Sequence, residues 1–223
     1  MKRLIIIVEG QTEKEFVENS LRKFFISKGI FDVRAIMIQT SKGNKGGFVN
    51  YDHLKNDITN LLKSEKNILV SMFVDFFRIP TSFPNFELSI SKSITDAKIE
   101  VLLEGISKDI NDTRFIPYIQ KHEFEALLFS SNEGFSNWFE NEWIIDELKT
   151  IINLYPNPEE INTGSDTAPS KRIIKILEEK RQKYDKIAEG NLIAEEIGFE
   201  KIMEKCPRFK NWILNLVENC KNS

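Results

Sequence analysis

The sequence predicts an α/β fold, with an open, mostly parallel sheet of about four strands flanked by helices and a mainly helical C-terminal extension. Short apolar runs alternate with segments of helical periodicity through residues 1–131, and this alternation is typical of a parallel sheet. From residue 132 the apolar spacing is helical or irregular. We therefore expect an α/β core at 1–131 and an extension at 132–223 that packs on the core within one structural domain.

The first three elements form a β-α-β unit. Residues 4–8 are all apolar and mostly β-branched, as in a strand that is buried on both faces near the centre of a parallel sheet. Thr12 and Glu15 match a capping box, which predicts a helix that begins at Thr12 and ends near Lys28. A second strand is expected at 33–38.

The alternation continues through two more strands. A helix at about 54–62 leads to a strand at 68–74, and a helix at about 99–110 leads to a fourth strand at 114–120. Because Pro117 cannot donate a hydrogen bond to a neighbouring strand, the fourth strand is expected at an edge of the sheet.

The composition excludes several classes of protein. The 223 residues are 41% apolar and 29% charged, as in an ordinary globular protein. A net charge of -3 provides no overall positive field, so a nucleic-acid site would have to be a local patch. Two cysteines and two histidines do not make a zinc site of the usual spacing. No segment resembles a signal peptide or a membrane span, so we expect a cytoplasmic location.

A glycine-rich basic loop at 41–47 carries Lys42 and Lys45. The loop lacks the order of a Walker A motif, so we expect no nucleoside triphosphate there. The two lysines are candidate contacts for nucleic-acid phosphates, and the alternative is a solvated connector.

Acidic side chains follow three of the predicted strands. Glu9, Asp75 and Glu123 each stand where a strand ends, and ligands of open α/β sheets gather outside the carboxyl ends of the strands. Carboxylates brought to one edge repel one another unless a hard cation such as Mg²⁺ neutralises them. The alternative is that each carboxylate is solvated or caps the following helix.

Several of these residues carry a resemblance to a known family. The turn at 8–13, followed by Asp75 after a later strand, resembles the Toprim domain of topoisomerases, primases and overcoming-lysogenization-defect nucleases. The whole chain more closely resembles the DUF4276 family of Toprim-like bacterial proteins. This second resemblance extends through residues 116–129, which include His122-Glu123-Phe124-Glu125-Ala126, and through residues 167–173 and 206–209.

The Toprim resemblance implies roles for three acids. Glu9 matches the glutamate that binds metal or transfers a proton, Glu13 matches the second glutamate of the nuclease branch, and Asp75 matches the first aspartate of an Asp-x-Asp metal motif. Phe77 stands where the second acid of that motif is expected. Its aromatic ring is suited either to base stacking or to the core.

We infer from strand order that Glu123 or Glu125 fills the gap left by Phe77, because the fourth strand ends at the same edge of the sheet. His122 is a candidate acid for the leaving oxygen, or a structural hydrogen-bonding group.

Lys171 and Arg172 lie in the first turn of a helix begun by Pro169, where the helix dipole disfavours cations. A backbone phosphate of nucleic acid or a neighbouring carboxylate would compensate them.

The expected function is a metal-dependent endonuclease that hydrolyses phosphodiester bonds in DNA or RNA with Mg²⁺ or Mn²⁺. The resemblance implies a bacterial anti-phage setting, often with an ATPase partner; the sequence leaves the oligomeric state open. One alternative is a Toprim-like scaffold that has lost its metal site and binds an ATPase or nucleic acid without cleaving it. Another is a receiver-like phosphoacceptor, although the lysine after a fifth strand that it requires is not found.

Overall fold

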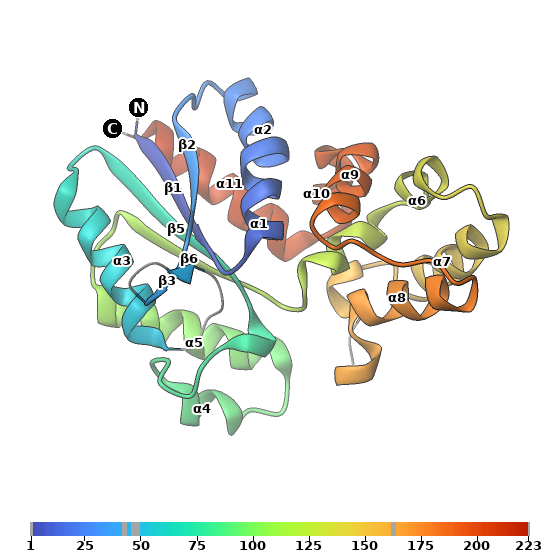
Figure 1. Cartoon of the computed structure of the whole chain (residues 1–223). Coiled ribbons are helices and arrows are strands. Elements are labelled where there is room, and N and C mark those ends of the chain that lie inside the picture. Colours follow the sequence, from blue (N-terminus) through green and yellow to red (C-terminus); the bar gives the residue numbers. More distant parts are fainter. Residues whose placement is uncertain (1, 42–43, 46–49, 162–163, 223) are drawn as a thin grey trace. The chain divides into compact units, whose positions relative to one another are not determined.

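The computed structural model describes residues 2–41, 44–45, 50–161 and 164–222 (Figure 1). The chain forms two compact units, one comprising Met1–Lys121 with Leu214–Ser223 and the other comprising His122–Ile213. The sequence pattern places the boundary at residue 131, where the helical spacing begins, and this domain boundary stays a prediction. In the described part of the chain, no helix is long and apolar enough to cross a membrane.

The first unit contains a four-stranded parallel sheet in the order β2-β1-β5-β6, which confirms the predicted fold class. β1 is central, as expected for a strand buried at every position after its first residue. β6 lies at an edge, where Pro117 is tolerated. The strands are β1 (Arg3–Val8), β2 (Val33–Met37), β5 (Ile68–Asp75) and β6 (Phe115–Gln120). A separate antiparallel pair is formed by β3 (Gln39–Ser41) and β4 (Asn44–Lys45).

Helices cover both faces of this sheet (Figure 1). α3 and α5 pack on one face, and α1, α2 and the end of α11 lie on the other. The helical elements of this unit are α1 (Gln11–Phe16), the π-helix η1 (Val17–Leu21), α2 (Arg22–Ser27), α3 (Tyr51–Ser64), the 3-10 helix η2 (Phe76–Arg78), α4 (Phe86–Ile90), α5 (Thr95–Ile110) and the end of α11 (Pro207–Lys221).

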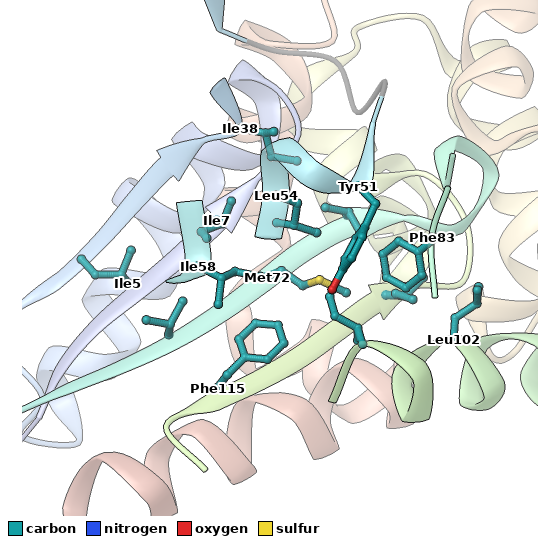
Figure 2. Close-up of a cluster of buried hydrophobic side chains, with 14 of the residues drawn as sticks. Ile5, Ile7, Ile38, Tyr51, Leu54, Ile58, Met72, Phe83, Leu102 and Phe115 are labelled. Carbon is teal, nitrogen blue, oxygen red and sulfur yellow. The ribbon is translucent and has the colours of Figure 1, made fainter. Parts of the chain in front are cut away.

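The core under α3 and α5 follows from the period of two along the strands. Ile5 and Ile7 of β1 and Met72 of β5 point to the same face and meet Leu54 and Ile58 of α3 (Figure 2). All five side chains are fully buried or nearly so. At roughly 1.5–3 kcal/mol for each such side chain, this layer is a large part of what holds the strands in register.

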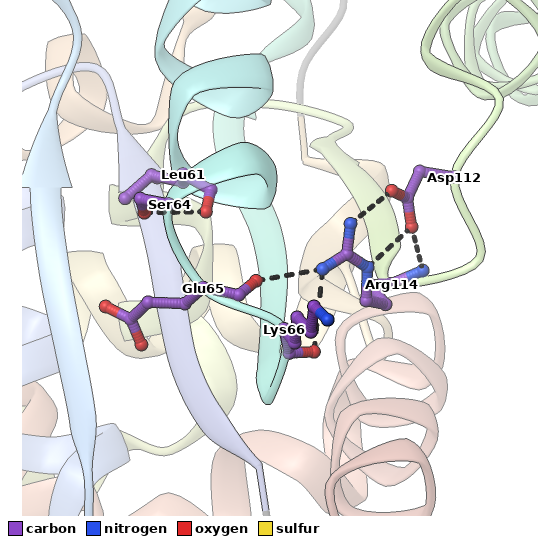
Figure 3. A network of polar contacts seen from close by, with 6 residues as sticks. All are labelled: Leu61, Ser64, Glu65, Lys66, Asp112 and Arg114. Carbon is purple, nitrogen blue, oxygen red and sulfur yellow. Dashed lines mark hydrogen bonds and ion pairs between the residues drawn. The ribbon is translucent and has the colours of Figure 1, made fainter.

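The amino ends of the strands are tied together by Arg114 (Figure 3). Its guanidinium donates to both carboxylate oxygens of Asp112, at 3.0 and 2.7 Å, and to the carbonyl oxygen of Glu65 at 2.9 Å. The hydrogen bonds from Arg114 hold the pKa of Asp112 below its usual value. This network joins the start of β6 to the turn before β5, at the edge of the sheet opposite the candidate site.

The first helix begins earlier than the capping box at Thr12 predicts. Its N-cap is Gly10, and the carboxylate of Glu13 accepts a hydrogen bond from the backbone N–H of Gly10 at 3.1 Å. The capping box is therefore displaced by two residues, and the expectation for Thr12 and Glu15 was wrong. The pair Gly10 and Glu13 has the same three-residue spacing as the pair Thr12 and Glu15. The earlier pair caps the helix because the chain turns directly after β1 ends.

The second unit is mainly helical, as predicted for this part of the chain. α6 and α9 approach closely at Gly134 of α6, where an added Cβ would lie 2.5 Å from the Ile197 side chain and 2.8 Å from the Ile193 carbonyl oxygen. The elements are η3 (Phe124–Ser130), α6 (Asn132–Trp138), α7 (Glu142–Leu154), η4 (Pro158–Glu160), η5 (Ser165–Thr167), α8 (Pro169–Glu179), α9 (Ala188–Ile197), α10 (Phe199–Lys205) and the start of α11.

Candidate functional site

Two buried carboxylates stand at the carboxyl edge of the sheet in the first unit. Asp75 is the last residue of β5, and Glu9 directly follows β1, whose Val8 is paired with Phe73. β1 and β5 are hydrogen-bonded neighbours, so their backbones are about 4.8 Å apart. Glu9 is 6% exposed and Asp75 is 8% exposed. Both acids therefore come to one edge, on adjacent strands and largely shielded from water.

These two acids suit a hard divalent cation. Buried carboxylates lose hydration and repel one another, and an oxygen-seeking cation relieves both effects. In the described part of the chain, no three His, Cys, Asp or Glu side chains form a group that could hold a metal ion. Mg²⁺ is usually held by one or two carboxylates, with water and substrate phosphate supplying the other ligands. The donor set at this edge fits that mode rather than a complete protein cage.

Gln120 is a candidate site residue that the sequence did not indicate. It is the register partner of Asp75 on the adjacent strand β6 and is fully buried. Its Oε1 accepts a hydrogen bond from the Tyr118 hydroxyl at 2.5 Å, and its Nε2 has no hydrogen-bond partner among the described residues. A buried amide donor at this position suits a carboxylate or a phosphate oxygen. The feature of the sequence that could have indicated Gln120 is a polar residue at the end of an apolar strand.

Lys121, which follows Gln120, was also missed. Its ammonium group is 3.0 Å from a carboxylate oxygen of Asp96 at the start of α5, and its side chain is 6% exposed. The ion pair joins the end of β6 to the helix that precedes this strand. It places a buried positive charge at the carboxyl edge of the sheet.

Glu13 supports the turn that follows Glu9. Its Oε2 accepts from the Gly10 N–H, and a Cβ on residue 10 would lie 3.0 Å from this oxygen. Glycine at position 10 therefore leaves room for the Glu13 carboxylate. A role for Glu13 as a metal ligand stays a prediction.

Phe77 lies two residues beyond Asp75, in the short helix η2. Its side chain is 55% exposed, and its ring contacts the ring of Phe76 at a centroid distance of 6.1 Å. An aromatic ring thus stands where the Toprim resemblance expects a second acid.

Glu123 and Glu125 belong to the second unit, where both contact Lys186. The Lys186 ammonium is 3.6 Å from a Glu123 oxygen and 3.4 Å from a Glu125 oxygen. Glu123 also accepts a hydrogen bond from the Ser170 N–H at 3.1 Å. Burial raises the pKa of Glu125 to about 7, against the opposing effect of Lys186. A side-chain cation therefore already offsets the charge of this pair.

The remaining predicted residues have separate surroundings. His122, the first residue of the second unit, is 4% exposed. Lys171 is exposed. Arg172 donates to the carbonyl oxygens of Thr167, at 2.8 Å, and Ile161, at 3.3 Å. Lys42 lies outside the described residues, and Lys45 is described only as a backbone position in β4.

The Arg172 guanidinium also lies over the ring of Tyr155, 5.4 Å from its centroid. Backbone carbonyls and an aromatic face thus compensate the charge of Arg172, in place of the phosphate or carboxylate expected from the sequence. A phosphate-binding role for Lys171 and Arg172 stays a prediction.

Comparison with known proteins gives a family and structural neighbours. The C-terminal region of the Burkholderia pseudomallei OLD protein is 14% identical and aligns over 97% of this chain and 99% of its own, with a TM-score of 0.45. The corresponding region of the Xanthomonas campestris pv. campestris OLD protein is 13% identical and aligns over 98% of this chain and 97% of its own, with a TM-score of 0.44. No curated protein matches the sequence. The family model described as a domain of unknown function, DUF4276, matches residues 8–217, and the chain therefore belongs to the DUF4276 family.

Proposed function

We propose that this protein is a metal-dependent nuclease, which hydrolyses phosphodiester bonds in DNA or RNA with Mg²⁺ or Mn²⁺. The observation that supports it best is the pair of buried carboxylates, Glu9 and Asp75, at the carboxyl ends of adjacent parallel strands. Open α/β sheets bind their ligands at this edge. The Toprim resemblance of the same residues points to the same chemistry.

Bound there, the metal would supply an activated water and would neutralise charge on the phosphate. Glu9 and Asp75 would hold it, and both are kept from bulk water, which strengthens their attraction for a cation. The Nε2 group of Gln120 would orient the Asp75 carboxylate or donate to a phosphate oxygen.

One proton transfer is assigned to a side chain at this edge. Glu9 would accept a proton from the attacking water, because a carboxylate beside a cation stays ionised at neutral pH. The roles of His122 as a proton donor and of Glu123 and Glu125 as metal ligands stay predictions from the sequence. Glu13 remains a candidate for a further metal contact in the first unit.

Replacing Glu9 with glutamine tests the proposal. Glu9→Gln keeps the size of the side chain and removes its charge, so cleavage of DNA or RNA in Mn²⁺ should fall by about 100-fold or more. Asp75→Asn should have a similar effect. The matched control is Glu104→Gln, which changes an exposed acid on α5 and should leave the rate unchanged. Circular dichroism establishes that each variant is folded.

Calorimetric titration with Mn²⁺ separates this proposal from the scaffold alternative. A nuclease site should show binding that Glu9→Gln and Asp75→Asn both remove. Cleavage that survives Glu9→Gln would contradict the proposal. Absence of Mn²⁺ binding in the unmodified protein, together with absence of cleavage, would favour a scaffold that binds nucleic acid or a partner without cutting.

An ATPase partner and a role in anti-phage defence are further parts of the proposal, and they follow from the family resemblance. Co-purification of the tagged chain from its own host, with and without ATP, tests for the partner.

A further inference from the structure

The candidate site carries an exposed aromatic ring that the chemistry of hydrolysis does not use. Phe77 is 55% exposed, two residues beyond Asp75. Among the phenylalanines in the described part of the chain, Phe31 is also exposed, at 68%, but it precedes β2 and so lies at the amino edge of the sheet. Phe77 thus combines exposure with a position beside the carboxylates.

The local structure holds this ring outward. Phe77 is the middle residue of η2, which begins immediately after Asp75. The preceding Phe76 packs against the core cluster beneath α3 and α5. Its ring supports that of Phe77, with 6.1 Å between centroids and 68° between planes. Because Phe76 is anchored in the core, the ring of Phe77 is positioned before any ligand arrives.

The charge balance of the chain makes base stacking a better-suited contact with nucleic acid at this position than ion pairing. The chain has 31 basic and 34 acidic residues, so no overall positive field draws nucleic acid to the carboxyl edge. Base–aromatic stacking requires no positive charge and tolerates any base, because every base has a π-face. In a duplex that face is covered by neighbouring bases, whereas an unpaired nucleotide presents it together with its phosphate.

We propose that Phe77 stacks on an unpaired base next to the phosphate held at Glu9 and Asp75, so that the substrate is single-stranded nucleic acid or a single-stranded segment. This inference rests on the proposed nuclease function and names its substrate class. Phe77 would determine which nucleic acid is bound, whereas Glu9 and Asp75 would take part in the hydrolysis.

Binding in Ca²⁺, a hard cation that carboxylate oxygens also hold, tests the stack with the phosphate site filled and without depending on a measurement of cleavage. Fluorescence anisotropy would compare the full chain and its variants on a labelled 20-nucleotide single strand, the same strand made abasic, and the matched duplex. Phe77→Ala should weaken binding of the normal single strand by about 5- to 150-fold, the value of one base–aromatic stack. Binding of the abasic strand and of the duplex should not change.

Two further variants control for folding and for loss of exposed apolar area. Phe77→Trp keeps an aromatic face and should retain single-strand binding. Phe31→Ala removes a similar exposed ring at the opposite edge of the sheet and should have no effect.

Three outcomes would overturn the proposal. One is unchanged single-strand binding by Phe77→Ala, another is an equal loss on abasic and normal strands, and the third is no binding of any strand by the unmodified protein. A change in self-association of Phe77→Ala, measured by light scattering, with unchanged single-strand binding would assign the ring to a protein interface. The nuclease proposal would survive all of these if metal-dependent cleavage still required Glu9.

Discussion

At the scale of single residues, Glu125 shows how the fold controls a charge. Its side chain is almost completely buried in η3, and loss of hydration raises its pKa to about 7. Lys186 lowers the pKa, and Glu123 raises it. The charge of Glu125 also contributes to the raised pKa of Tyr184, after burial of that hydroxyl. The Glu125 carboxyl therefore keeps its proton to a higher pH than an exposed glutamate does.

This pKa predicts a dependence of stability on pH. The pKa of Glu125 is raised from 4.5 to about 7 in the folded protein, so between these values the folded state binds more protons than the unfolded state. Its contribution to stability is therefore present below pH 4.5 and is lost as the pH rises to 7. Glu125→Gln should remove this loss and gain up to roughly 3 kcal/mol relative to the unmodified protein between pH 5 and pH 8.

Urea unfolding at pH 5, 6.5 and 8 measures this effect. Glu104→Gln, an exposed acid, serves as the control and should follow the unmodified protein. Parallel stability profiles for Glu125→Gln and the unmodified protein would show that the carboxyl stays ionised across this range.

The residue scale also shows which site positions a sequence can reveal. Glu9 and Asp75 were predicted because each is a charged residue at the end of a strongly apolar strand. Gln120 occupies the equivalent position on β6, but an uncharged amide has no chemical signature without its surroundings. Its significance comes from register, since it is paired with Asp75 across the sheet.

At the scale of elements, a buried carboxylate caps the amino end of the last helix. Glu159 of η4 is fully buried, and its two oxygens accept the N–H groups of Arg208, at 2.8 Å, and Phe209, at 3.0 Å. These are N–H groups of the first turn of α11, which has no helical acceptor for them. An acid 48 residues before the helix in sequence thus satisfies its amino end. Together with burial, the Glu159 charge raises the pKa of the Cys206 thiol.

Removing the Glu159 charge should weaken this capping. Glu159→Gln keeps the shape but loses the charge–dipole attraction and puts an amide NH₂ in place of one acceptor oxygen, so the free energy of unfolding should fall by about 1–3 kcal/mol. Thermal and urea unfolding measure the change. Glu160→Gln, at the exposed neighbouring position, should change stability by less than about 0.5 kcal/mol. Equal effects of the two substitutions would mean that the cap contributes nothing specific.

Element boundaries are hard to predict where local patterns are ambiguous. The helix begun by Pro169 ends at Glu179, and Arg181 then adopts a positive φ of 58°. No apolar position in this charged stretch marks the end of the helix. β1 and β5 were located well because buried parallel strands give continuous apolar runs.

At the scale of the whole molecule, contacts between segments far apart in the chain could not be predicted from the sequence. α11 begins in the second unit and ends in the first, where the backbone N–H of Lys2 donates to the carbonyl oxygen of Cys220 at 3.2 Å. Apolar spacing predicted mainly helical structure in this part of the chain. It could not predict that the last ten residues belong with β1, because hydrophobic spacing reports a buried face but not the partner of that face.

The distribution of charge over the molecule predicts how salt affects nucleic-acid binding. The net charge is -3, and several cations are already engaged, since Lys121 pairs with Asp96 and Lys186 with two glutamates. Because the net charge provides no overall attraction for a polyanion, we expect few phosphate contacts, and each such contact would add about -0.7 to the slope of log K against log salt. We expect a slope shallower than about -2 for a single strand, so raising KCl from 50 to 200 mM should weaken binding by less than roughly 16-fold.

Anisotropy titrations of the single strand across this range of KCl measure the slope. Lys171→Ala removes an exposed candidate contact and should make the slope shallower by about 0.7 if Lys171 meets a phosphate. A slope of about -5 or steeper in the unmodified protein would instead require about seven phosphate contacts. Binding would then be dominated by a basic surface, because stacking at Phe77 and coordination by Glu9 and Asp75 displace no such number of counterions.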